Sequence, residues 1–365
     1  MVSILLSSND LRANHLFGRL KNYCDIIGHV DFDDIDPLTR CGAAALTFRR
    51  SRIAWWRAYQ MHSLMQRRRR RVVQRALLSQ PIPVDALLMW GSWFHPTKGS
   101  GLTTPFFQYI DESLEAPSAD ANRVQRESFR LQAEAYSECS AIFCMSRWAR
   151  DQAIASHPGC AERLHVVGWG PCGVDLSNEE IPEDVRQPIV LHVSNDFTRK
   201  GVDFLIQTAE LVRSRLPAAR FVVVGRDNSF DTRAVSETVS FVGRISNRDE
   251  LSRYFRAASV FLLPHRFDRS PHVLVEAMSA GLPLVASAQG GAIELIENVG
   301  TGFLVPVGDV EGYADAIERL LVDRAKRAQM GAAARQLMRR SYTWDRVARN
   351  MVELMSCRLA TSLTN

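Results

Sequence analysis

Two carboxylates, Asp268 and Glu276, stand on either side of a turn that leads from a strand into a helix. The sequence predicts a strand that ends at Leu263 and a helix that opens near Ser270 or Pro271, because Ser is a favoured N-cap and Pro suits the first helical turn. Backbone N–H groups at a helix start bind phosphate. Glu276 lies one to two turns further into the helix. The turn therefore predicts a site for a phosphate-bearing ligand, with an acid within reach of a second group on that ligand.

Two adjacent cations, Arg199 and Lys200, follow a second expected strand, Ile189–Val193. Arg offers a fork of donors and Lys a point charge, and both bind a diphosphate. Two further expected strands end in Gly225 and Gly243. A glycine at such a place lets a flat base approach the backbone.

Each of these pieces also has a structural explanation. An Arg-Lys pair after a strand is common on solvated surfaces, a glycine that ends a strand is often only a turn, and a helical Glu is usually exposed. Their order along the chain is more specific than any one of them. Each of these elements follows a separate expected strand. In chain order they are Arg-Lys-Gly, two strand-ending glycines, Asp-x7-Glu and Gly290-Gly291-x-x-Glu294. This order indicates one composite site.

Short, nearly continuous apolar runs alternate with helical stretches along the whole chain, which predicts parallel sheets covered on both faces. Two such series predict two doubly wound domains, with ligands outside the carboxyl ends of the strands. In the first half we expect strands at Val2–Ser7, Ile26–Val30, Ala43–Phe48, Ala86–Trp90, Pro105–Ile110, Ala141–Met145 and Leu164–Val167. In the second half we expect strands at Ile189–Val193, Phe221–Val224, Val239–Val242, Val260–Leu263, Leu284–Ala286 and Phe303–Val305.

With these motifs the chain resembles the retaining, nucleotide-sugar-dependent glycosyltransferases of the B-type fold (family 4, the glycosyl transferases group 1). The resemblance is specific over about Ile189–Asp345 and weaker over the first half. It implies an α/β fold of two facing Rossmann-like domains with a donor cleft between them. It also implies residues 1–175 as an acceptor domain, residues 176–341 as a nucleotide-sugar donor domain, and residues 342–365 as a helix that crosses back to the first domain.

The resemblance also assigns roles to residues. Arg199 and Lys200 match the family's pair on the donor diphosphate, and Glu276 matches the acid on the ribose hydroxyls. Asp268 matches the acid beside the transferred sugar. The backbone amides that face the phosphates match those of Arg269, Ser270, Pro271 and His272.

Three positions depart from the family pattern. Asp268 stands where Glu is usual, which withdraws the charge by one methylene. Asp111 stands after the strand ending at Ile110, where the family often has His. The glycine loop after the first strand is replaced by a segment that contains Asn9 and Arg12. His95 follows the strand ending near Trp90, and we count it with Asp111 and Asp268 as a candidate catalytic residue.

The expected reaction is transfer with retention and without a metal, because fixed cations and helix-start amides can meet the charge of the leaving nucleoside diphosphate. The donor is expected to carry UDP or GDP, with a glycan or lipid-linked acceptor in cell-surface polysaccharide or glycolipid synthesis. The one Asp-x-Asp, Asp31 to Asp33, is interpreted as surface or helix-cap acid, and no cofactor is expected. Alternatives are a nucleotide-sugar epimerase or hydrolase, a phosphorylase, and a catalytically idle nucleotide-sugar-binding protein.

The charge is concentrated in one segment. Eleven arginines and no acid lie between Pro37 and Val84, and without them the net charge of +5 would become −6. The arginines of Arg49–Arg75 are interleaved with Trp55, Trp56 and Tyr59. They indicate either a solvated helix end or docking to an anionic membrane surface or a phosphate-bearing acceptor. Nucleic acid is not expected, because no recognition motif accompanies the charge.

The remaining composition fits a cytoplasmic protein. The 365 residues are 46% hydrophobic, which is enough for two cores. Seven cysteines without a CxxC pair predict reduced thiols and no zinc site. The start of the chain reads as a strand and no long apolar run occurs, so we expect a cytoplasmic protein, peripheral at the inner membrane face.

Overall fold

The computed structural model describes residues 2–8, 13–34, 44, 63–91, 94–182, 186–228, 230, 238–296 and 300–364. It divides into two compact units. The first unit consists of Met1–Gly168 together with Trp344–Asn365, and the second is Trp169–Thr343. The sequence predicted the boundary after residue 175, whereas the first unit ends at Gly168. The boundary is earlier because the segment after Gly168 bonds to a helix of the second unit.

The second unit is built on a parallel sheet whose six described strands lie in the order β12-β11-β10-β7-β8-β9. Chain order reverses between β7 and β10, and a doubly wound sheet binds its ligands outside the carboxyl ends of the strands at such a switch point. The strands are β7 (Ile189–Val193), β8 (Arg220–Val224), β9 (Val239–Gly243), β10 (Val260–Leu263), β11 (Leu284–Ser287) and β12 (Gly302–Val305).

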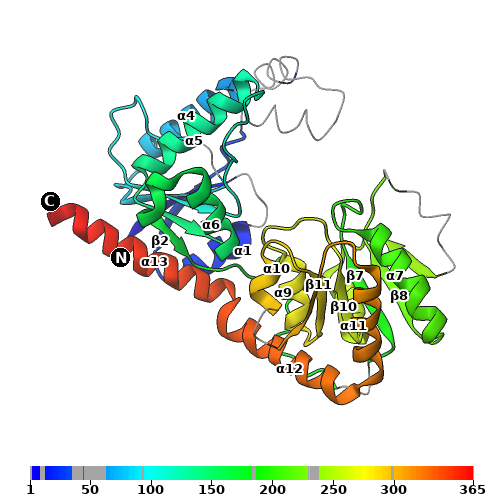
Figure 1. The fold of residues 1–365 in the computed structure, drawn as a ribbon. Coiled ribbons are helices and arrows are strands. Elements are labelled where there is room, and N and C mark those ends of the chain that lie inside the picture. Colours follow the sequence, from blue (N-terminus) through cyan, green and yellow to red (C-terminus); the bar gives the residue numbers. More distant parts are fainter. Residues whose placement is uncertain are drawn as a thin grey trace. The chain divides into compact units, whose positions relative to one another are not determined.

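Helices cover both faces of this sheet (Figure 1). One face packs on α7 (Val202–Arg215) and α11 (Val310–Val322) around a core that includes Phe221, Leu262 and Ile317. The opposite face carries α9 (His272–Ser279), which contacts β10 and β11. The unit also contains α8 (Arg248–Ala257), α10 (Ala292–Ile296) and α12 (Arg324–Ser341).

The first unit has a parallel sheet with its described strands in the order β2-β1-β3-β4-β5-β6. The strands are β1 (Ser3–Ser7), β2 (Asp25–Val30), β3 (Ala86–Trp90), β4 (Phe106–Ile110), β5 (Ala141–Cys144) and β6 (Leu164–Val166). The helices are α1 (Ala13–Leu20), α4 (Ser63–Leu78), α5 (Arg123–Glu138), α6 (Arg147–Ser156) and α13 (Trp344–Thr364), with a 3-10 turn at Pro158–Arg163.

The last helix, α13, belongs to this first unit. It packs along α1, and the hydroxyl of Tyr23 donates to Asp345 at 2.7 Å. Trp344 lies against Trp90 of β3, with ring centroids 5.9 Å apart. The chain thus returns from the second unit to complete the first.

The predicted fold class, α/β with two Rossmann-like domains, is confirmed. Twelve predicted strands fall on the observed ones within two residues, while the expected strand Ala43–Phe48 lies outside the described residues except for Ala44, which is helical. Asn9, Arg12 and the basic segment before Ser63 also lie outside them. In the part of the chain that the structure describes, no helix is both long and apolar enough to cross a bilayer.

Candidate functional site

The candidate site of the second unit is centred on a contact between Lys200 and Asp268. The Lys200 ammonium lies against Oδ2 of Asp268, and both side chains are almost fully buried, at 13% and 12% exposure. Lys200 ends the loop after β7 and Asp268 lies in the loop after β10, so the two loops at the switch point meet through this ion pair. Burial opposes ionisation of Asp268, but Lys200 and then Arg199 outweigh it and hold its pKa below the ordinary value.

The two loops approach closely because a glycine stands at the contact. Gly201 has φ of +71°, and a Cβ there would lie 1.8 Å from the carbonyl oxygen of Pro264. The N–H of Arg266 donates to the carbonyl of Arg199 at 2.9 Å. A side chain at position 201 would therefore force the loops apart and break the Lys200–Asp268 contact.

Arg199 reaches across the same two loops. Its Nε donates to Asp196 at 2.8 Å, and an Nη donates to the carbonyl of Phe267 at 3.1 Å. The side chain is 42% exposed, so its remaining N–H donors face solvent. Arg199 and Lys200 are thus held at the carboxyl ends of β7 and β10, where the sequence predicted a cationic site.

Helix α9 begins one residue later than expected. Pro271 is the N-cap and makes no side-chain cap hydrogen bond, while the sequence predicted Ser270 in that role. The Ser270 hydroxyl is buried and has no hydrogen-bond partner among the described residues. A buried hydroxyl that caps nothing is available to a ligand at the helix start.

The loop after β11 supports this helix start. The N–H of Gly291 donates to the carbonyl of Asp268 at 3.1 Å. A Cβ at Gly290 would lie 1.9 Å from the Asp268 carbonyl oxygen, and one at Gly291 would lie 2.3 Å from that of Arg269. The Gly-Gly pair noted in the sequence therefore lets one loop sit directly under the other.

Glu276 points toward the segment that opens the second unit. Its Oε1 accepts the N–H of Gly173 at 2.7 Å and that of Cys172 at 3.2 Å. Burial raises the pKa of Glu276 to about 7, although the two N–H groups act in the opposite direction. Among the described residues Oε2 accepts no hydrogen bond, which leaves that oxygen for a ligand hydroxyl.

His272 is held by the same segment. Its Nδ1 donates to the carbonyl of Gly170 at 2.8 Å, and the Cys172 sulfur lies 3.2 Å from that nitrogen. Sequence reasoning missed Cys172 and Gly173 as partners of Glu276, because the contact spans more than 100 residues.

Gly225 and Gly243 lie at the carboxyl ends of β8 and β9, and each also has a structural reason to be glycine. A Cβ at Gly225 would lie 1.6 Å from the carbonyl oxygen of Ser194, so this glycine makes room for the loop after β7. Gly243 has open space around it and needs glycine for its φ of +84°. The N–H of Gly225 donates to the carbonyl of Gly243 at 2.8 Å.

The candidates in the first unit lie at opposite edges of its sheet. Asp111 follows Ile110 directly, at the carboxyl end of β4. His95 lies against Phe106, the first residue of β4, with ring centroids 4.6 Å apart. Its Nε2 is 3.0 Å from a Glu138 oxygen at the end of α5, and burial, the largest effect, lowers its pKa. By His95 the chain has returned to the edge of the sheet where the strands begin. Ligands are expected at the opposite edge, where the strands end, so this placement argues against the predicted catalytic role of His95.

The carboxylates of Asp31 and Asp33 are both bonded to other groups of the protein. Asp31 accepts the N–H of Asp33 at 2.8 Å, and the Asp33 carboxylate lies 2.5 Å from Nε of buried Arg69. Arg69 also lies over the Phe32 ring, at 5.6 Å. Arg69, one of the five consecutive arginines Arg67–Arg71, is thus a core residue that pairs with Asp33.

The second unit therefore brings cations, helix-start amides and two acids to one edge of its sheet. Lys200, Arg199 and the start of α9 suit an anionic group. Glu276 suits a hydroxyl-bearing group one helical turn away, and Asp268 contacts Lys200. A molecule with linked phosphates and a polyhydroxylated part matches this arrangement.

Comparison with known proteins agrees with this chemistry. Residues 175–337 match the family model described as glycosyl transferases group 1. Over 184 residues the chain is 31% identical to a GDP-mannose-dependent alpha-(1-6)-phosphatidylinositol monomannoside mannosyltransferase of Mycobacterium tuberculosis, covering 47% of this chain and 48% of that protein. It is 34% identical to a sulfoquinovosyl transferase of Arabidopsis thaliana, covering 47% and 33%. The chain thus spans about half the length, or less, of these relatives.

Solved structures share the fold of the whole chain. Sucrose-phosphate synthase from Thermosynechococcus elongatus superposes with a TM-score of 0.71 at 17% identity, over 99% of this chain and 100% of that one. HepE of Anabaena, solved in complex with UDP, superposes with a TM-score of 0.68 at 18% identity, over 98% and 100%. At these identities the likeness establishes the fold, which both units share with these proteins.

Proposed function

We propose that this chain moves a sugar from a nucleoside-diphosphate sugar to a hydroxyl acceptor. The premise is that it belongs to the glycosyl transferases group 1 through residues 175–337. The observation that carries the proposal is the Lys200–Asp268 contact, because it sets a cation and a carboxylate side by side at the switch point of the sheet. Glu276 lies one helical turn away on α9.

Lys200 and Arg199 bind the donor diphosphate. In the chain alone each cation has a carboxylate partner, Asp268 and Asp196 respectively. A diphosphate adds charge beside these pairs and takes up their remaining N–H donors, together with backbone amides at the start of α9. These groups stabilise the charge on the leaving nucleoside diphosphate. Their placement favours metal-independent transfer.

Asp268 stabilises the reacting sugar as a carboxylate. Its pKa is lowered by Lys200 against the effect of burial, so it is ionised at neutral pH and suits a developing oxocarbenium charge better than proton donation. The shorter side chain of Asp is compensated by its position, since Lys200 and the Gly290 loop fix both its carboxylate and its backbone. We propose transfer with retention on this basis and on family membership.

Glu276 binds the ribose of the donor through Oε2, while Cys172 and Gly173 hold Oε1. The donor base is proposed as uracil or guanine, because relatives named above use GDP-mannose or were solved with UDP. Gly225 and Gly243 lie at the strand ends next along the sheet, where a base attached to that ribose would reach.

The acceptor is proposed to be a glycan or a lipid-linked glycan, used in cell-surface polysaccharide or glycolipid synthesis. Printed names of relatives support this class, since they act on phosphatidylinositol mannoside or take part in amylovoran biosynthesis. Asp111, at the carboxyl end of β4, is the acid of the first unit proposed to act on the reacting groups.

Helix α4 supplies a surface for such an acceptor. Arg67, Arg71 and Arg75 are exposed and lie four residues apart, so they form one stripe along the helix. Leu78 is 70% exposed at the end of the helix, and Ile82 is 48% exposed just beyond it. A cationic stripe ending in exposed apolar side chains suits a peripheral contact with anionic lipid at the inner membrane face. The arginines between Arg49 and Arg57 lie outside the described residues.

The test is a binding and turnover assay with a panel of UDP, GDP, ADP and dTDP sugars. One donor should raise the melting temperature in a concentration-dependent way. The same donor should be hydrolysed slowly without acceptor, and Glu276→Ala should abolish both effects. Stabilisation without any turnover, in wild type and with every glycan acceptor tried, would favour a catalytically idle binding protein instead. Release of a free or epimerised sugar as the main product would favour a hydrolase or epimerase.

A further inference from the structure

A histidine lies fully buried in the loop that carries Asp268. His265 is the second residue after β10, and its side chain is 0% exposed. Its Nδ1 lies 3.0 Å from the carbonyl oxygen of Leu263, and its Nε2 lies 3.1 Å from that of Gln289, in the loop after β11. The ring therefore joins two of the loops that form the candidate site, and both of its nitrogens face carbonyl oxygens.

A neutral imidazole cannot satisfy both of these partners. A carbonyl oxygen only accepts hydrogen bonds, and a neutral ring has one N–H to donate and one nitrogen lone pair. One nitrogen of neutral His265 must therefore set its lone pair against an oxygen. An imidazolium has two N–H groups and satisfies both carbonyls, with hydrogen bonds about twice as strong as those of a neutral donor.

The buried His192 of β7 has partners of a different kind. Its Nδ1 lies 2.9 Å from the carbonyl oxygen of Leu262, but its Nε2 lies 2.8 Å from the hydroxyl of Ser194. A hydroxyl can donate to a ring nitrogen, so the neutral form of His192 satisfies both contacts. Burial, the largest effect, lowers the pKa of His192 to about 4. Of these two rings, only His265 gains a hydrogen bond when it is protonated.

The charge on His265 depends on the groups of the candidate site. Burial, the largest effect, lowers the pKa of His265, and the charge of Lys200 acts in the same direction. The two carbonyl oxygens and Asp268 oppose this effect. His192 is the neighbouring titratable group on β7, and a charge on His265 would disfavour its protonation further. At neutral pH the ring of the chain alone is therefore mostly neutral, and one of its two contacts has no hydrogen.

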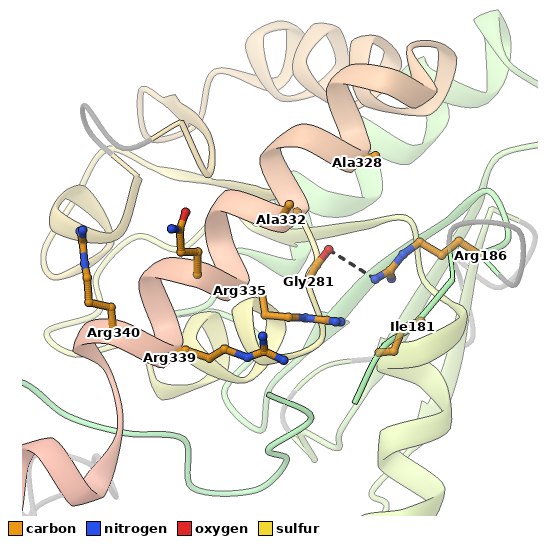
Figure 2. A pocket seen from close by; sticks show the side chains of 10 residues that line it. Ile181, Arg186, Gly281, Ala328, Ala332, Arg335, Arg339 and Arg340 are labelled. Atoms are coloured by element: carbon orange, nitrogen blue, oxygen red, sulfur yellow. Dashed lines mark hydrogen bonds between the residues drawn. The ribbon is translucent and has the colours of Figure 1, made fainter. Parts of the chain in front are cut away.

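The far end of α9 is anchored independently of these loops. Arg186 donates to the carbonyl of Ala280 at 2.6 Å and to that of Gly281 at 3.3 Å, and Figure 2 shows the contact with Gly281. Arg335 of α12 donates to the same Ala280 carbonyl at 3.0 Å. Because α9 is held at its carboxyl end, a change in the loops around His265 acts on the start of the helix.

We propose that donor binding draws a proton from solvent onto His265, and that the imidazolium then ties the loops after β10 and β11 around the bound diphosphate. The inference rests on the proposed function, since the diphosphate is assigned to Lys200. Its negative charge offsets the ammonium that disfavours protonation of the ring. His265 is thus a positioning residue. The residues on either side of it, Pro264 and Arg266, contact the loop after β7 through their backbones.

The first test is calorimetric titration of the full chain with GDP-mannose and UDP-glucose, in two buffers of different ionisation enthalpy. The diphosphate of a nucleotide sugar is esterified at both ends, so it takes up no proton of its own near neutral pH. We expect uptake of about 0.5 proton per donor bound at pH 6.5, and an affinity that falls about threefold between pH 6.5 and 7.5.

Two variants remove the charge of His265 and keep one hydrogen bond each. The amide of His265→Asn can donate to Leu263, and that of His265→Gln can donate to Gln289. Proton uptake should fall by about 0.5 in both variants, and the affinity should lose most of its pH dependence. Glu276 titrates in the same range and is unchanged, so its share of the uptake remains. The matched control is His157→Gln, at a buried histidine of the first unit, which should keep the wild-type uptake.

Nitrogen NMR of the chain labelled in histidine locates the proton directly. The signal that disappears in either variant belongs to His265. It should move toward the charged form when the nucleotide sugar is added at pH 6.5, while the His192 signal stays neutral. Donor binding that leaves the His265 signal unchanged, or equal proton uptake in wild type and the His265 variants, would overturn the inference and leave the proposed function standing. Failure of every nucleotide sugar to bind would contradict the proposed function, and this inference with it.

Discussion

The backbone N–H of Gly173 lies 2.7 Å from Oε1 of Glu276 and joins the first residues of the second unit to the middle of α9. A buried carboxylate is thereby fixed by main-chain donors, which no side-chain substitution removes directly. Glycine at position 173 allows the approach, because a Cβ there would lie 3.2 Å from the same oxygen.

Gly173→Ala should therefore weaken donor binding. The added methyl group displaces the carboxylate by a few tenths of an ångström, and we expect about a fivefold rise in the donor Kd, comparable to the loss of one hydrogen bond. Titration calorimetry with the preferred nucleotide sugar measures it. The control is Gly159→Ala, where a Cβ meets nothing within 4 Å. Equal Kd values in wild type and Gly173→Ala would contradict the positioning role.

Protonation of Glu276 should make stability depend on pH. Burial raises its pKa from 4.5 to about 7. Between these values the native state holds a proton that the unfolded chain has lost, so the free energy of unfolding should fall as pH rises through that window. The fall is at most about 3 kcal/mol. Urea unfolding of wild type and Glu276→Gln from pH 4 to 8 measures it, and the variant should lack this component. Parallel pH profiles for the two proteins would contradict the raised pKa.

Separating Lys200 from Asp268 should cost both stability and activity. Lys200→Met leaves a buried carboxylate without its cation, which costs about 3 kcal/mol. Asp268→Asn in the same chain should restore most of that stability, because no uncompensated charge remains. Turnover should stay at least about a hundredfold below wild type in both, since the charge that acts on the donor is gone. Urea unfolding and initial rates decide; recovery of turnover in the double variant would exclude a catalytic role for the pair.

Two glycines at neighbouring strand ends should respond differently to the same change. At Gly225, with φ of +136°, a Cβ would lie 1.6 Å from the Ser194 carbonyl oxygen; at Gly243, with φ of +84°, it would meet nothing. Gly243→Ala should cost about 1 kcal/mol from backbone strain alone. Gly225→Ala should cost considerably more and should also displace the loop that carries Lys200. Melting temperatures measure the difference, and similar losses would contradict the close approach.

The arginine stripe of α4 should direct membrane binding. Replacing Arg67, Arg71 and Arg75 by Gln together should reduce pelleting with phosphatidylglycerol vesicles by about tenfold or more, because each exposed cation contributes about 1 kcal/mol near an anionic surface. Neither protein should pellet with phosphatidylcholine vesicles. Added salt should weaken binding of the wild type to phosphatidylglycerol vesicles. A control triple variant removes exposed arginines of the second unit: Arg253, Arg319 and Arg324. Equal losses in the two triple variants would show general charge attraction and not docking by α4.

Much of the fold followed from local pattern. Apolar runs such as Ile189–Val193 and Val260–Leu263 match β7 and β10 residue for residue, since buried parallel strands are continuous in hydrophobicity. Strand ends in turn predicted that Lys200 and Asp268 would share an edge. What the sequence could not supply was the path of loops. His95 follows β3 but lies beside the first residue of β4, because its loop has already returned to the opposite edge.

The pairings inside the site were equally beyond local pattern. Gly173 and Glu276 are 103 residues apart, and nothing near either residue names the other. The sequence indicated a need for space at Gly225, but it could not show that Ser194 of the chain itself is one neighbour that requires it. Close approach of two backbones leaves a glycine in one of the two segments and no mark of its partner.

The contacts of Gly201 with Pro264 and of Gly290 with Asp268 have a consequence for engineering. The loops after β7, β10 and β11 approach backbone to backbone at these two glycines, where there is no room for a side chain. Grafting only residues 264–271 from a relative with another sugar preference should give a poorly folded chimera. Transferring the three loops together, as one interlocking piece, is the smallest exchange that keeps them matched.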